Sequence, residues 1–165
     1  MHQIQCPSPV GPLLLASDGQ ALCLIEFESP RHPFRRGGDW VVQEDAILRE
    51  ARRQLDEYFE GRRRGFDLPL APRGTQFQQR VWMALRDIAY GETVSYAQLA
   101  TRLGMPMATR AVGAANGRNP LPIVVPCHRV IGADGSLTGF GGGLPTKQFL
   151  LQLEGALEAR DLFAT

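Results

Sequence analysis

Residues 62–74, RRRGFDLPLAPRG, constrain the fold most, because they separate two halves that have different patterns of apolar residues. The segment is polar and contains two prolines, which is typical of a connection between folded units. A chain of 165 residues can form one medium domain or two small ones. We therefore place a domain boundary near Leu70, between an N-terminal domain of residues 1–70 and a C-terminal domain of residues 71–165.

The half before this segment combines strand and helix patterns. Residues 13–17 and 21–27 are apolar runs joined by an Asp-Gly pair, which predicts two strands around a tight turn. Between residues 43 and 60 apolar side chains recur on one face of a helix, and Gly61 is expected to end it. The half is therefore predicted to be an α/β domain, a small sheet with a helix. The apolar face of that helix consists of Ile47, Ala51, Leu55, Tyr58 and Phe59.

The half after the segment is mainly helical by the same criterion. Apolar residues at helical spacing from 77 to 88 predict a helix, and Thr75 is a suitable N-cap. Two shorter helices are expected at residues 95–104 and at about 108–116, separated by a Met-Pro break, which makes a helix-turn-helix candidate. The second of these is almost without bulky side chains, so its backbone can come close either to a neighbouring helix or to a ligand.

Composition excludes some classes of protein. No apolar run approaches the ~20 residues of a membrane span, and the N-terminus lacks the pattern of a signal peptide. The chain has three cysteines, a small and odd number that does not suit a disulfide framework. We therefore expect a cytoplasmic protein with no membrane partner. Residues 72–129 carry a net charge of +5, and all their cations are Arg, which suits phosphate and stacked partners. A solvated arginine surface has the same composition.

The stretch IVVPCHRVIG, residues 123–132, joins an apolar run to a thiol and an imidazole. Residues 123–125 predict a short buried strand, and Pro126 suits the first position of a helix. Cys127 is then expected at a strand-to-helix corner, where the helix N-terminus would lower the pKa of its thiol. His128 would point away from Cys127, so a proton passing between them would need a bridging water. The alternative is an inert buried cysteine beside a surface histidine.

Several segments together resemble the O6-alkylguanine-DNA alkyltransferase family. They are GTQFQQRVWMALRDIAYGETVSYAQLA (74–100), RAVGAANGRNPLPIVVPCHRVIG (110–132) and LTGFGGGLPTKQFLLQLEG (137–155), with weaker similarity in SPVGPL (8–13) and QLDEYFEG (54–61). A Pro-Cys-His-Arg box at a set distance after Asn-Pro is highly specific. The resemblance implies an N-terminal domain of ribonuclease-H-like topology and a mainly α C-terminal domain with a winged-helix-like helix-turn-helix.

The resemblance implies a role for each residue of the active site. Cys127 would accept the alkyl group, His128 would take the thiol proton through a water, and Glu154 would orient the imidazole. Asn119 would brace the turns around the cysteine. Tyr96 would hydrogen-bond the N3 edge of the guanine and help to protonate the departing base. Without the resemblance, Glu154 would be interpreted as a solvated carboxylate and Tyr96 as an aromatic of the core.

The resemblance also implies how damaged DNA is bound. Arg110 would fill the space left by the extruded nucleotide, because chemistry on a base requires its removal from the stack. The small residues of its helix would enter the minor groove, about 6 Å wide, where large side chains do not fit. Lys147 would pack near the pocket, although it also suits an ordinary helix surface. The other DNA contacts are assigned to Ala108, Thr109, Ala111 and Gly113, and the pocket to Pro122, Val130, Phe140, Gly141 and Lys147.

The predicted function is therefore DNA repair by direct damage reversal in double-stranded DNA. An alkyl group on guanine O6, or less efficiently on thymine O4, would pass irreversibly to Cys127, once per protein molecule. No cofactor is expected and no metal, because Cys6, Cys23 and His32 lack the spacing of a zinc site. The protein is expected to be a monomer, with clustering on DNA left open.

Three alternatives are a lesion-binding protein without transfer activity, an alkylation-sensing regulator and a cysteine hydrolase. The presence of Cys127 argues against the first. The short chain argues against the second. The lack of a recognisable triad argues against the third.

Overall fold

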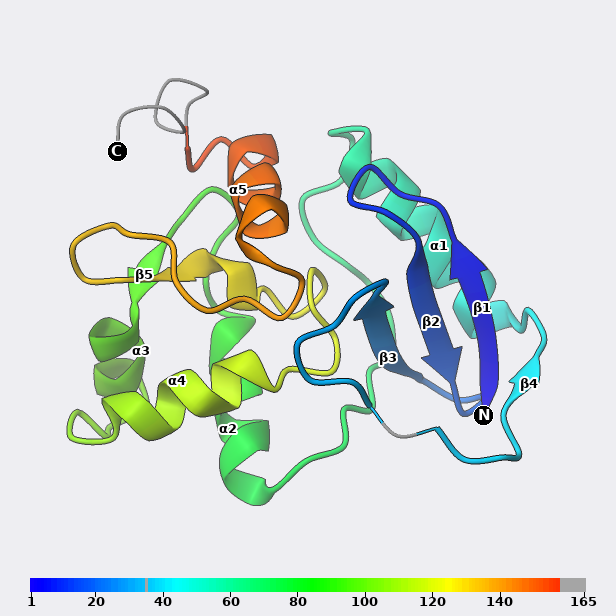
Figure 1. Ribbon diagram of the computed structural model, residues 1–165, viewed down its shortest axis with the longest axis horizontal. Helices are drawn as coiled ribbons and strands as arrows, with labels where there is room; N and C mark the ends of the chain where they lie inside the picture. The colour runs from blue at the N-terminus through cyan, green and yellow to red at the C-terminus, as the bar shows by residue number, and fades with distance from the viewer. Residues whose placement is uncertain (35, 158–165) are drawn as a thin grey trace.

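The computed structural model describes residues 1–34 and 36–157, which form two packed parts (Figure 1). A sheet with one helix across it makes up the N-terminal part, and a group of helices follows. One hydrophobic core runs through both parts, and Leu13, Tyr58, Val81 and Val112 are among its fully buried members. The predicted order, an α/β half before a mainly helical half, is confirmed. Within the described residues, no helix is long and apolar enough to cross a membrane.

The N-terminal sheet has four strands in the order β3-β2-β1-β4. β1 (His2–Cys6) pairs antiparallel with β2 (Leu13–Ser17), β2 pairs antiparallel with β3 (Leu22–Phe27), and β4 (Val41–Val42) runs parallel to β1. Every residue of β2 and β3 is buried, which explains why their apolar runs were recognisable in the sequence. β1 and β4 were not predicted, because β1 is mostly polar and β4 is a pair of exposed residues.

Helix α1 (Ala46–Phe59) lies across the sheet (Figure 1). Asp45 caps it, since its carboxylate accepts hydrogen bonds from Leu48 N at 2.8 Å and from Ser17 Oγ at 2.9 Å. One carboxylate thus starts the helix and ties it to β2. The predicted apolar face is confirmed: Ala51, Leu55 and Tyr58 are buried, and Ile47 and Phe59 are half-buried at its margins.

The edge of β3 is covered by backbone from later in the chain. Leu22 N donates to Pro69 O at 2.8 Å, and Leu22 O accepts from Ala71 N at 2.9 Å, so the connecting segment extends the sheet. Farther along β3, Ile25 N donates to Pro120 O at 2.9 Å. These bonds satisfy a strand edge that would otherwise be unpaired, and they tie the sheet to the turn that follows Asn119.

The C-terminal part contains the predicted helix-turn-helix. Thr75 and Ser95 both form capping boxes, so the first two helices begin at residues that the sequence marks locally. The last helix of the motif packs against the two before it, and Trp82 Nε1 donates to Ala115 O at 2.9 Å. The elements are α2 (Gln76–Leu85), β5 (Val94–Ser95), α3 (Tyr96–Arg102), α4 (Thr109–Gly117), the 3-10 helix η1 (Cys127–Arg129), β6 (Val130–Ile131) and α5 (Leu144–Leu153).

Residues 123–125 do not form the predicted strand but part of a tight turn, in which Val125 N donates to Leu121 O at 2.8 Å. Asn119 holds this turn, because its Nδ2 donates to Val125 O at 2.7 Å and its Oδ1 accepts from Leu121 N at 2.9 Å. Ile123 has a φ of 75°, a left-handed conformation that β-branched residues rarely adopt. The Asn119 side chain thus supplies hydrogen bonds that a neighbouring strand would supply, and the apolar run is buried without one.

Candidate active site and nucleic-acid interface

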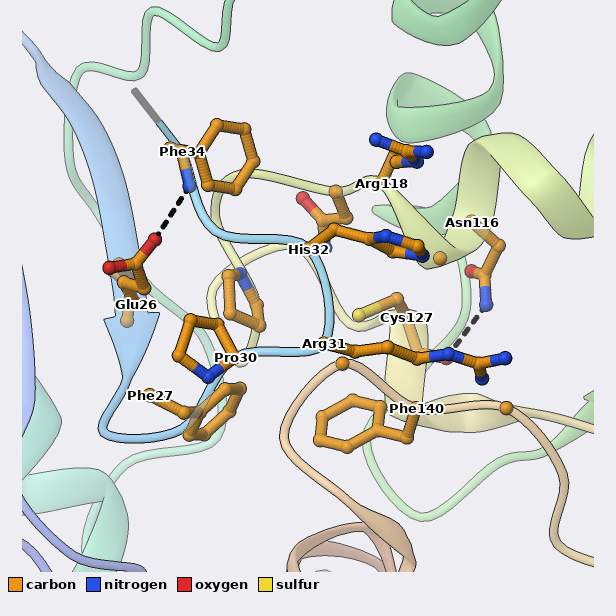
Figure 2. A pocket seen from close by; sticks show the side chains of 16 residues that line it. Glu26, Phe27, Pro30, Arg31, His32, Phe34, Asn116, Arg118, Cys127 and Phe140 are labelled. Atoms are coloured by element: carbon orange, nitrogen blue, oxygen red, sulfur yellow. Dashed lines mark hydrogen bonds between the residues drawn. The ribbon is translucent and has the colours of Figure 1, made fainter. Parts of the chain in front are cut away.

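Cys127 lies at the start of η1, directly after the turn held by Asn119. Its backbone N donates to Val125 O at 2.8 Å, so the turn sets its position. The side chain is 5% exposed, and the thiol points into a cavity between the sheet and the helical part (Figure 2). The helix that begins here has only three residues, so the predicted strand-to-helix corner is a turn followed by a single 3-10 turn.

The cavity beside Cys127 is enclosed by β3 and the loop after it, by the end of α4 and its following turn, and by the loop before α5 (Figure 2). Its volume is about 40 Å³, which leaves room for little more than a water molecule. Arg31 N donates to Gly141 O at 3.0 Å and so joins two of these loops. Phe140 packs edge to face on Phe27, with ring centroids 5.6 Å apart. The cavity is therefore narrow.

His128, the residue after Cys127, forms a buried pair with Glu154. The imidazole Nε2 lies 2.8 Å from Glu154 Oε2, and both side chains are inaccessible to solvent. Burial lowers the pKa of His128 and outweighs the carboxylate, so the imidazole is neutral. A carboxylate can only accept, hence Nε2 carries the hydrogen and Nδ1 is free to accept a proton. Nδ1 has no hydrogen-bond partner among residues 1–34 and 36–157.

Glu154 is held by two further side chains for which the sequence suggested no role. Arg129 Nε donates to Glu154 Oε1 at 2.8 Å and its Nη2 donates to Oε2 at 3.0 Å, while Tyr58 Oη donates to Oε2 at 2.6 Å. Burial alone would raise the pKa of Glu154, but the hydrogen bonds from His128 and Arg129 lower it to about 2. Glu154 is therefore ionised and fixed. Arg129 was visible in the Pro-Cys-His-Arg box. Tyr58 was predicted only as part of an apolar helix face, and no local signal marked it as a partner of Glu154.

The electrostatics around the Cys127 thiol differ from the prediction. Burial raises the pKa of Cys127, and Asn119 and Lys147 offset this only in part, so the expected lowering by a helix N-terminus is wrong. Lys147 is itself fully buried, and its Nζ donates to Val130 O at 2.6 Å and to Thr138 O at 2.9 Å. The helix-surface alternative for Lys147 is therefore wrong. The resting thiol is protonated and needs a base before it can act as a nucleophile.

The other predicted pocket residues divide into two groups. Pro122, Phe140 and Gly141 line the cavity of Cys127. Val130 is fully buried outside the cavity lining, and its carbonyl binds Lys147, which in turn holds the loop before α5 through Thr138. These two residues support the cavity wall without forming its surface.

A second hollow, of about 490 Å³, runs along α4 and opens beside the cavity. Tyr96, Thr109, Arg110 and Gly113 line it, and the two hollows share Gly139, Phe140 and Gly141. Tyr96 Oη donates to Thr138 O at 3.2 Å at the base of this groove. Arg110 and Ala111 are exposed and Ala108 is half-buried, but neither alanine lines the groove. The structure thus brings most of the predicted DNA contacts to one surface that leads to Cys127.

The three predicted candidates for metal binding do not form a cluster. Cys6 and Cys23 are buried free thiols, and Cys23 Sγ donates to Ala21 O at 3.6 Å. His32 lies instead in the wall of the Cys127 cavity (Figure 2). Across the described ranges 1–34 and 36–157, no group of three or more His, Cys, Asp or Glu side chains could hold a metal ion.

Comparison with known families matches the two halves separately. Residues 1–72 match the model described as 6-O-methylguanine DNA methyltransferase, ribonuclease-like domain. Residues 76–156 match the model described as 6-O-methylguanine DNA methyltransferase, DNA binding domain. The two matches together span nearly the whole chain.

Curated relatives cover almost the same length. The methylated-DNA–protein-cysteine methyltransferase of Methanosarcina acetivorans is 52% identical over 90% of this chain and 95% of its own. The protein of that description from Mycobacterium tuberculosis is 48% identical over 98% of this chain and 97% of its own. A solved structure of Mycobacterium tuberculosis OGT in complex with DNA has a TM-score of 0.87 and 47% identity, and the match covers 94% of each chain.

Proposed function

The chain belongs to the 6-O-methylguanine DNA methyltransferase family, and from that membership we propose that it removes alkyl groups from guanine O6 in double-stranded DNA. The alkyl group passes irreversibly to Cys127, so each molecule acts once. One observation carries the proposal: a protonated thiol lines a cavity, and the next residue in the chain is a neutral imidazole whose Nε2 is held by an ionised carboxylate. This is the nucleophile, base and orienting group of covalent catalysis.

The groups of the site account for every bond and proton that changes in the alkyl transfer. The thiol proton of Cys127 passes through a water to Nδ1 of His128, and Glu154 stabilises the imidazolium that forms. The thiolate attacks the alkyl carbon, a sulfur–carbon bond forms, and the carbon–O6 bond breaks with its electron pair leaving on the guanine. The guanine then takes up one proton, for which the Tyr96 hydroxyl is the donor. The thioether product is not readily hydrolysed, which accounts for single use.

Access of the base requires the nucleotide to leave the duplex. In this groove α4 presents the small residues Gly113, Ala114 and Gly117, which suit the narrow minor groove. Exposed Arg110 projects there to fill the vacated stack. Because the Cys127 cavity is too small for a base, the base enters only when the loops joined by the Arg31–Gly141 hydrogen bond separate. We propose that one molecule acts on each lesion, and that O4-alkylthymine is a poorer substrate.

The test is transfer from a duplex that carries O6-methylguanine with a labelled methyl group. Label should saturate at one methyl group per protein molecule, and intact-protein mass followed by peptide mapping should place it on Cys127. Cys127→Ala should still bind the duplex but accept no label, whereas the matched control Cys23→Ala should behave as the unaltered protein does. Turnover well beyond one equivalent, or label retained by Cys127→Ala, would overturn the proposal.

A further inference from the structure

A third hollow, of about 260 Å³, lies beside the turn that carries Cys127. Its walls come from the segment after α1, the segment after α2 and that turn. It shares no lining residue with the Cys127 cavity or with the groove along α4. The turn therefore contacts two separate spaces, and alkyl transfer gives no role to this one. The turn residues that line it are Ile123, Val124 and Pro126.

The charges around this hollow are all positive. Among the residues that the structure describes, three arginines and no carboxylate line it, namely Arg64, Arg86 and Arg129. Arg129 is buried, and its charge is balanced by Glu154. Arg64 and Arg86 are exposed, and neither forms an ion pair with any residue of 1–34 or 36–157. Two like charges thus remain uncompensated at one hollow, which favours the binding of an anion there.

The ring of Tyr90 holds two of these guanidinium groups in place. The guanidinium carbon lies 5.2 Å from the ring centroid in Arg64 and 5.7 Å in Arg129, within the range of a cation–π contact. The ring is itself anchored to α5, because Tyr90 Oη donates to Leu153 O at 3.3 Å. A guanidinium group that stacks on an aromatic face keeps its N–H edge available to a ligand. The positive charge is therefore positioned before any ligand binds.

Arg129 also retains hydrogen-bond donors that its protein partners do not use. A guanidinium group has five N–H groups, and three of those of Arg129 donate to the Glu154 carboxylate and to Ile88 O. The two that remain belong to a side chain that lines the hollow. An anion there would accept from Arg129 without breaking its contacts with Glu154.

The size of the hollow limits which anion it can hold. Its volume is several times the ~30 Å³ that one water occupies, and it lies below the ~300 Å³ at which pockets for drug-sized ligands begin. A single tetrahedral anion suits this space. The forked N–H groups of arginine match the oxygen atoms of a phosphate in pairs, so phosphate fits both the volume and the donors.

We propose that the hollow lined by Arg64, Arg86 and Arg129 binds one phosphate group, supplied by inorganic phosphate or by the backbone of a DNA strand outside the α4 groove. The proposal does not depend on alkyl transfer, because it uses none of the residues that line the Cys127 cavity. The simplest rival is that Arg64 and Arg86 are solvated surface arginines. Because the hollow is lined by the turn before Cys127, a bound phosphate would stabilise the folded protein around its active site.

The first measurement compares the binding of inorganic phosphate by three proteins. One is the unaltered chain, and one is the double variant Arg64→Gln, Arg86→Gln, which leaves Arg129 in place. The matched control, Arg73→Gln with Arg80→Gln, has the same net charge but alters exposed arginines outside the hollow. Urea unfolding is followed as phosphate rises, with chloride keeping the ionic strength constant, because binding to the folded state raises the unfolding free energy.

The unaltered chain and the control should bind phosphate equally. The double variant should bind it about tenfold or more weakly, since one hydrogen bond to a charged group contributes about that factor. A second measurement, of binding to an undamaged duplex over a range of salt, identifies the source of the phosphate. If a DNA phosphate occupies the hollow, the slope of log affinity against log salt should be smaller by about 1 in the double variant than in the control. Weaker phosphate binding with an equal slope would assign the site to inorganic phosphate. The inference is wrong if the double variant matches the control in both measurements.

Discussion

Replacing Glu154 with Gln should destabilise the protein as well as slow alkyl transfer. The carboxylate is inaccessible to solvent and accepts hydrogen bonds from His128, Arg129 and Tyr58. Gln is nearly isosteric but neutral, so it leaves the Arg129 guanidinium buried without an opposite charge. Breaking a buried ion pair in this way costs about 3–5 kcal/mol of unfolding free energy.

The pH dependence of the unfolding free energy gives a second estimate of how much the Glu154 carboxylate stabilises the fold. The pKa of Glu154 is lowered from 4.5 to about 2 in the folded protein, a difference worth about 3 kcal/mol. Because the folded pKa lies below the unfolded one, this stability is fully present above about pH 4.5 and is lost as the pH falls toward 2. Glu154→Gln lacks the titrating group, so the acid-dependent loss of stability should be smaller in the variant.

The assay is urea unfolding at neutral pH and at steps down to about pH 3, together with single-turnover transfer where each protein is folded. Loss of assistance to the base should slow transfer by about 10²–10⁴-fold. Tyr58→Phe is the matched control, because it removes one hydrogen bond from Glu154 but keeps the charge, and it should cost about 1.5–3 kcal/mol, less than the loss of the ion pair.

Two results would refute this reasoning. One is a Glu154→Gln variant that loses less than about 1 kcal/mol at neutral pH and keeps the acid dependence of the unaltered protein. The other is a folded variant that transfers alkyl groups at the unaltered rate across neutral pH. The first result would show that the ion pair does not stabilise the fold, and the second would show that Glu154 takes no part in alkyl transfer.

Two further predictions concern Arg110 and Lys147. Arg110→Ala should slow repair of O6-methylguanine in duplex DNA by about tenfold or more, because base extrusion costs a few kcal/mol, yet it should leave transfer from free O6-benzylguanine almost unchanged. Single-turnover rates on both substrates test this, and an equal loss on both would contradict the role in extrusion. Burial lowers the pKa of Lys147 from 10.5 to about 8, so the unfolded chain binds that proton more tightly and the unfolding free energy should rise with pH above 8. By about pH 9.5 the rise due to Lys147 should reach about 2 kcal/mol; urea unfolding of Lys147→Met should lack it, and identical pH profiles would contradict the assignment.

Local patterns allowed helices α1 to α4 to be predicted from the sequence. Thr75 and Ser95 each cap a helix with a residue three positions later, and the apolar face of α1 repeats at helical spacing. Such signals depend on neighbours in the chain and need no tertiary contact. The strand expected at residues 123–125 does not form, because its prediction depended on backbone pairing that no local pattern specifies. An apolar run indicates that a segment is buried, but not which groups pair with its backbone. Here the side chain of Asn119 forms the hydrogen bonds with the backbone of a turn.

The sequence by itself determined the order of the two halves, the presence of helices α1 to α4 and the motif that places Cys127, His128 and Glu154 in one family pattern. The tertiary structure decided the charge states, because these depend on burial and on partners far away in the chain. Tyr58 lies 96 residues from the Glu154 it binds, and no local pattern links two such positions. Burial raises the pKa of the Cys127 thiol that its place at a helix start was expected to lower. The same packing shields the 2.8 Å hydrogen bond between His128 and Glu154 from water, which requires that segments distant in the chain come together.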